Sequence, residues 1–114
     1  MEKDLERRTK RFSLAIIKLT AALPRTREAD VVSRQLLRSA TSIGANYREA
    51  NRGVSRADFA NKIGTVQKEA SETQYWIELL IESGLASKAA AQDLLREVSE
   101  LLAIFTAIGK KLKA

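Results

Sequence analysis

The chain has 114 residues, a formal net charge of +6, and neither cysteine nor histidine. Without these residues it can form no disulfide or thiolate metal site, and it lacks the commonest general base and metal ligand. We therefore expect no catalytic residues, no metal and no other cofactor. The size predicts one domain covering residues 1–114, and the single proline and few β-branched runs favour an all-α fold.

The first predicted helix covers residues 2–23 and ends before Pro24, because the residue before a proline is pushed out of the helical region. Its apolar side is formed by Leu5, Phe12, Ile16, Leu19 and Leu23. The apolar stretch is interrupted by Lys18 and is too short to span a bilayer or make a good signal peptide. We therefore expect a cytoplasmic protein without a membrane partner.

The start of this helix carries a cluster of cations interspersed with Glu2, Asp4 and Glu6. These acids can pair with cations four residues away, so we interpret the cluster as the solvated, fraying start of the helix. A helix lying on a membrane surface is the alternative, but the acids argue against it. The cations are Lys3, Arg7, Arg8, Lys10 and Arg11.

The second predicted helix covers residues 28–51, with Gly53 as its C-terminal stop. At about 100° per residue, Arg34 and Arg52 point the same way, and three more arginines lie within about 40° of them. The row from Arg34 to Arg52 is about 27 Å long at 1.5 Å per residue, a reach that suits a nucleic-acid backbone. The arginine stripe consists of Arg27, Arg34, Arg38, Arg48 and Arg52.

Two interpretations of the arginine stripe remain open. Arginine offers a bidentate fork for phosphate, and every basic residue from Arg25 to Arg56 is arginine. Alternatively, the stripe is a solvated face with salt bridges. The opposite side of the helix is apolar and predicts a core face, formed by Val32, Leu36, Ala40, Ile43, Tyr47 and Ala50.

A run of small residues, 39–46, interrupts the same helix and includes Gly44 and Asn46. Glycine in a helix interior costs roughly 1 kcal/mol relative to alanine. Small residues on successive turns allow another helix to approach closely. That helix can belong to the same chain or to a second subunit.

Ser55 and Asp58 resemble a capping box that opens a third helix, which Gly84 ends. Ser87 can cap a fourth helix, whose last turn carries three lysines that suit the helix dipole. Both helices repeat apolar residues at spacings of four and three, as in a heptad. The two series are Phe59, Ile63, Val66, Ala70, Thr73, Ile77 and Leu80, and Leu94, Val98, Leu101, Phe105, Ile108 and Leu112.

The third predicted helix is acidic and carries two adjacent aromatic residues. Residues 31–57 contain five arginines and one acid, whereas residues 58–83 contain two lysines and five acids. A basic helix can dock on an acidic one within a chain or between subunits. We expect Tyr75 to be exposed, Trp76 to close the bundle edge, and Glu69 and Glu72 to make polar contacts between helices or subunits. An exposed tyrosine favours an interface.

Four helices with short connections predict an antiparallel up-down-up-down four-helix bundle. The stretch from Arg38 to Leu80 contains SIGANYREA, S-x-x-D-F and E-x-x-x-T-x-Y-W-I-E-L-L. These motifs resemble the 23S ribosomal RNA intervening-sequence proteins, also called the S23 ribosomal protein family. Many members carry Asn-Ile-x-Glu-Gly, from which residues 46–50 of this chain depart. The resemblance implies a small bacterial homopentamer without enzymatic activity, related to the nucleic-acid-binding accessory proteins of diversity-generating retroelements.

The functional hypothesis is a homo-oligomer that binds structured RNA by shape and charge, with no small-molecule substrate. The arginine stripe supplies the candidate phosphate contacts. The candidate oligomer interface comprises Gly44, Asn46, Glu72, Tyr75 and Trp76. The alternative is an oligomeric protein-interaction scaffold without nucleic-acid binding, in which the arginines pair with the acidic helix of a neighbour.

Overall fold

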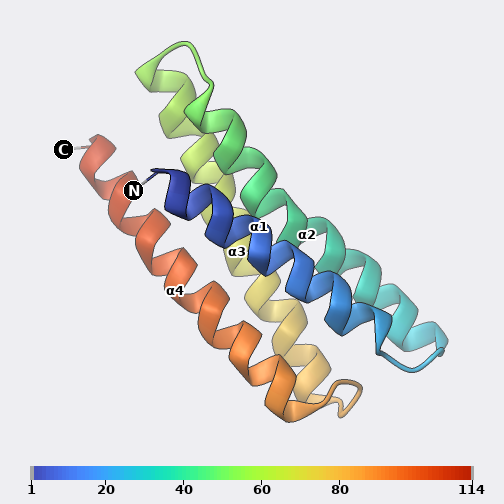
Figure 1. Ribbon diagram of the computed structural model, residues 1–114. Helices are drawn as coiled ribbons and strands as arrows, with labels where there is room; N and C mark the ends of the chain where they lie inside the picture. The colour runs from blue at the N-terminus through green and yellow to red at the C-terminus, as the bar shows by residue number, and fades with distance from the viewer. Residues whose placement is uncertain (1, 114) are drawn as a thin grey trace.

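The computed structural model describes the backbone of residues 2–113 and the side chains of residues 4–113. This part of the chain is entirely helical apart from its connections. Adjacent helices run in opposite directions, and α1 begins at the end of the bundle where α4 finishes (Figure 1). The predicted antiparallel up-down-up-down bundle is therefore confirmed. The helices are α1 (Glu2–Ala21), α2 (Arg27–Asn51), α3 (Arg56–Glu82) and α4 (Lys88–Lys113).

The four helices form a rod of 44 × 21 × 20 Å. Each helix packs beside the two that flank it, so α1 contacts α2 and α4, and α3 contacts the same two. The backbones of α1 and α4 share the least contact of these pairs. The predicted apolar sides meet at the bundle axis, where Tyr47 of α2 packs edge-on against Phe105 of α4 with ring centroids 5.1 Å apart.

The helix ends follow the local sequence signals closely. The Ser55 side chain accepts a hydrogen bond from the backbone N–H of Asp58 and caps α3, as predicted. Gly84 follows the end of α3 with φ of +77°, a conformation that glycine adopts without a Cβ penalty. The Thr26 side chain caps α2 by accepting from Ala29 N–H, a signal that the sequence analysis did not use.

Two polar features lie inside the bundle. Thr9 of α1 is fully buried, and its hydroxyl donates to the carbonyl of Leu5 at 2.8 Å. Thr73 of α3 is also buried, and its hydroxyl lies 2.9 Å from Ser39 Oγ of α2. Buried hydroxyls require such partners because an unsatisfied one costs about 1–3 kcal/mol. The contact between Thr73 and Ser39 joins α3 to α2 inside the core.

Candidate nucleic-acid interface

All five residues of the arginine stripe are exposed, but four of them are engaged within the chain. Arg34 pairs with Asp30 one turn earlier, at 2.9 Å. Arg52 donates to the carbonyl of Arg48 and lies 3.7 Å from Glu6 Oε1 of α1. Arg27 contacts the neighbouring Glu28 at 3.4 Å. The solvated-face interpretation thus describes much of the stripe.

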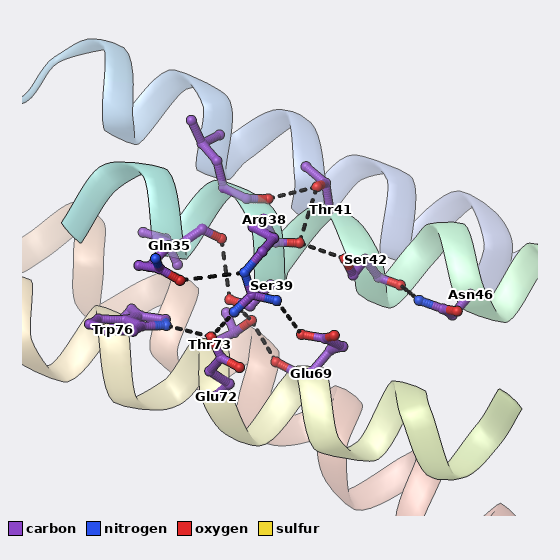
Figure 2. Close-up of polar contacts among 12 residues, drawn as sticks. Gln35, Arg38, Ser39, Thr41, Ser42, Asn46, Glu69, Glu72, Thr73 and Trp76 are labelled. Atoms are coloured by element: carbon purple, nitrogen blue, oxygen red, sulfur yellow. Dashed lines mark hydrogen bonds and ion pairs between the residues drawn. The ribbon is translucent and has the colours of Figure 1, made fainter. Parts of the chain in front are cut away.

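Arg38 joins α2 to the acidic helix α3 within the same chain. Its guanidinium lies 3.3 Å from Glu69 Oε1 and also pairs with Glu72. Glu72 in turn accepts a hydrogen bond from Trp76 Nε1 at 2.9 Å. Figure 2 shows these side chains converging between the two helices. The predicted interhelix role of Glu69 and Glu72 is confirmed, and the basic helix docks on the acidic one inside a single subunit.

Arg48 differs from the rest of the stripe because its side chain has no hydrogen-bond or ion-pair partner among the described residues. On the α1 side it lines a groove of about 380 Å³ together with Arg7 and Lys10, and on the α3 side it borders a second hollow with Asp58 and Lys62. Ser13 and Thr41 also line this groove. We call this feature the α1–α2 groove.

The base of the α1–α2 groove depends on Gly44. A Cβ built on Gly44 would lie 3.2 Å from Thr9 Oγ1, closer than most Cβ contacts in proteins. The absence of a side chain therefore lets α1 and α2 pack tightly beneath Arg7, Lys10 and Arg48. This contact gives Gly44 a role inside the chain, one of the two alternatives that the sequence left open.

One cation near the start of α1, Arg8, makes specific contacts with another helix that the sequence did not predict. Arg8 reaches across to α4, where its Nε lies 2.7 Å from Glu97 Oε2 and its Nη2 lies 2.9 Å from Glu100 Oε1. The hydrogen bond to Glu97 is the largest cause, and together with the one to Glu100 it raises the pKa of Arg8 above its usual value. The sequence suggested pairing within α1, whereas Arg8 pairs with α4; the side chains of Glu2 and Lys3 lie outside the described residues.

Arg7, Lys10 and Arg11 remain exposed and without a polar partner among the described residues. The convergence of Arg7 and Lys10 with Arg48 was not predicted from the sequence. The short connection between α1 and α2 could have predicted it, because a short connection makes the two helices antiparallel neighbours and places residues 7–10 beside residue 48.

The residues expected at an oligomer interface lie in different surroundings. Tyr75 is 52% exposed, as predicted, and packs edge-on against Trp76 with ring centroids 5.0 Å apart. Trp76 is half-buried against the core, which confirms its place at the bundle edge. Asn46 donates to the Ser42 carbonyl at 2.8 Å within α2. Of these residues, Tyr75 offers the most surface to a partner.

The described residues contain no group of acidic residues placed to hold a metal ion. No helix among them is long and apolar enough to cross a membrane.

The fold and its surface define a four-helix bundle with a cationic groove between α1 and α2. The family model of the 23S rRNA-intervening sequence proteins matches residues 2–107. A crystal structure of a protein with unknown function from the S23 ribosomal protein family, from Bacteroides thetaiotaomicron VPI-5482, is 38% identical in sequence. It matches with a TM-score of 0.85 over 92% of this chain and 97% of that chain. No curated protein matched. The chain therefore belongs to the 23S rRNA-intervening sequence protein family.

Proposed function

We propose that this protein is a non-enzymatic homo-oligomer that binds structured RNA through its basic surface. The observation that carries the proposal is the uneven pairing of charge. The acids of α2 and α3 engage Arg34 and Arg38, whereas Arg7, Lys10, Arg11 and Arg48 have no partner among the described residues. Unpaired cations on one side of a protein with net charge +6 attract a polyanion.

The family supports RNA as that polyanion. Its name refers to an element of the 23S ribosomal RNA, and it is not an enzyme family. Phosphate contacts by arginine and lysine contribute most of the affinity in sequence-independent nucleic-acid binding. In the proposed function, the protein therefore recognises the charge and shape of the RNA and not its base sequence.

Self-association would strengthen this binding. The resemblance implies a homopentamer, and several copies of one weak site gain affinity because each bound copy raises the effective concentration of the next. Tyr75 supports an interface on α3, because large exposed aromatics are enriched at such surfaces.

The first test is gel filtration of the purified protein with light scattering and absorbance at two wavelengths. We expect a mass above that of one 12.6 kDa chain, together with co-purified nucleic acid that high salt removes. Binding to RNA should weaken steeply as salt is raised, because bound phosphates release their counterions. Affinity that does not change with salt would contradict the proposal.

The second candidate function is a protein-interaction scaffold, in which the arginine stripe pairs with a neighbouring subunit. Glu78 and Glu82 of α3 are exposed and have no partner among the described residues, so they could accept such contacts. Replacing Arg34 and Arg52 with glutamate distinguishes the two functions. Dissociation of the oligomer would favour the scaffold, whereas loss of RNA from an intact oligomer would favour the arginine stripe as the RNA contact.

A further inference from the structure

The surface most accessible to an anion is not the one that contains the most arginines. In the arginine stripe, Arg34, Arg38 and Arg52 each lie beside a carboxylate of the same chain. A phosphate would have to compete with these carboxylates for each guanidinium. Arg7, Lys10 and Arg48 face no such competition, and they converge from two helices on one groove.

We propose that the α1–α2 groove holds the phosphates of a base-paired RNA backbone. This inference rests on the proposed RNA-binding function and names the site and the class of RNA. Arg7, Lys10 and Arg48 are the residues that would contact phosphate.

The one acid of the groove does not oppose this role. Glu6 lies at its end, where one carboxylate oxygen accepts from Asn51 Nδ2 at 2.9 Å and the other lies 3.7 Å from Arg52. The carboxylate of Glu6 therefore contacts Asn51 and Arg52, and the positive charge of Arg52 partly offsets its negative charge. The groove as a whole keeps a positive surplus.

The hydroxyl groups that line the groove already donate hydrogen bonds within the protein, so the cations are the groups that can contact a phosphate. Ser13 Oγ donates to the Thr9 carbonyl at 3.2 Å, and Thr41 Oγ1 donates to the Leu37 carbonyl at 2.6 Å. Their hydrogens are thus used within their own helices. The site offers charge and two guanidinium forks, which suit phosphate oxygens.

The absence of aromatic side chains at the groove decides between paired and unpaired RNA. Proteins that bind single strands stack bases on exposed aromatic rings. Phe12, Tyr47 and Phe105 are buried in the core, and the one exposed aromatic among the described residues, Tyr75, lies on α3. α3 is diagonally opposite α1 in the bundle. A duplex keeps its bases inside and presents phosphates, which is what the groove can bind.

The basic surface continues along α1 beyond the groove. Arg11 and Lys18 are exposed and have no polar partner among the described residues. From Arg7 to Lys18 the helix rises roughly 16 Å, at 1.5 Å per residue. This length allows one strand to follow α1 while the groove holds successive phosphates.

The test compares two triple variants that lose the same charge. The groove variant carries Arg7→Gln, Lys10→Gln and Arg48→Gln. The control carries Lys68→Gln, Lys88→Gln and Arg96→Gln, all exposed residues that lie outside both the groove and the arginine stripe. Binding of a short blunt RNA duplex, and of one of its strands alone, is measured by fluorescence anisotropy over a series of salt concentrations.

We expect the groove variant to lose at least about tenfold in affinity for the duplex and about three units of the log–log salt slope, one for each lost phosphate contact. The control should lose less than about threefold. Wild-type protein should bind the duplex more tightly than the single strand. Circular dichroism should show unchanged unfolding of the groove variant, because its three side chains have no partners to lose.

Several results would overturn the inference. Equal losses in both variants would mean that RNA binds through diffuse charge, which leaves the proposed function standing. Tighter binding of the single strand would exclude a site for paired RNA. A groove variant that dissociates the oligomer would make the groove a subunit contact. Wild-type protein that binds neither RNA would overturn both this inference and the proposed function.

Discussion

Gly44 and Gly64 show how differently two helical glycines can act in one protein. Gly44 lies against Thr9, which is fully buried and held by its hydrogen bond to Leu5. Thr9 therefore cannot move aside easily for an added methyl group. Gly64 is exposed on α3, and a Cβ there would meet nothing within 4 Å. Gly44 is required by packing, whereas Gly64 only weakens its helix.

We predict that an added side chain is tolerated at Gly64 and resisted at Gly44. Gly64→Ala should raise the free energy of unfolding by about 0.5–1 kcal/mol through helix propensity. Gly44→Ala should gain less or lose stability, and Gly44→Val should lose about 1–3 kcal/mol through overpacking. Urea denaturation of the three variants checks this. A stabilising Gly44→Val would show that α1 and α2 are not in close contact.

At the scale of elements, Arg8 supplies all the hydrogen bonds and ion pairs that join α1 to α4 among the described residues. These two helices share the least backbone contact of the neighbouring pairs. Arg8 bridges them with a guanidinium that reaches both Glu97 and Glu100. Its side chain is 27% exposed, so solvent screens this contact only partly.

Arg8→Gln should therefore lower the free energy of unfolding by about 1.5–3 kcal/mol, the range for hydrogen bonds to charged groups. Arg8→Lys should restore only part of this, because an ammonium lacks the fork. Amide hydrogen exchange should show the largest loss of protection in α1. Arg7→Gln is the matched control, since Arg7 has no partner among the described residues, and it should change stability by less than about 0.5 kcal/mol.

The same contact predicts a pH dependence. Because the folded state raises the pKa of Arg8, the contribution of this guanidinium is fully present below the pKa of arginine in the unfolded chain. It is lost only as the pH rises through the folded value. The stabilising effect of Arg8 over Gln should therefore be constant between neutral and mildly alkaline pH. A loss over that range would contradict the assignment.

At the scale of the whole molecule, the proposed oligomer needs one outer face of the bundle as its interface. Tyr75 on α3 is 52% exposed and Leu14 on α1 is 54% exposed, so the two helices present large apolar side chains on diagonally opposite sides. The proposed interface uses the α3 side. The proposed RNA site uses the α1 side, where Arg7, Lys10 and Arg11 are exposed.

Serine substitutions at these two residues form a matched pair for the oligomer. Tyr75→Ser should lower the mass measured by light scattering, because an aromatic anchor at an interface commonly costs more than 1 kcal/mol when truncated. Leu14→Ser removes a side chain of similar exposure and should leave the mass unchanged. Dissociation by Leu14→Ser alone would place the interface on α1 and contradict the prediction.

The sequence by itself determined the four helices, their apolar faces and most of their ends. These features are local: a helix face follows from the spacing of residues three and four apart, and a cap such as Ser55 acts within one turn. The outward position of Tyr75 and the edge position of Trp76 follow from the same spacing. The family resemblance rests on this local pattern as well.

Only the tertiary structure decided which cations are free. Arg38 meets acids 31 and 34 residues away, and Arg8 meets an acid 89 residues away, so their pairing depends on which helices are neighbours and in what register. The convergence of Arg48 with Arg7 and Lys10 likewise follows from the close approach at Gly44. Helical periodicity places a charge on a face, but packing decides whether a carboxylate lies within its reach.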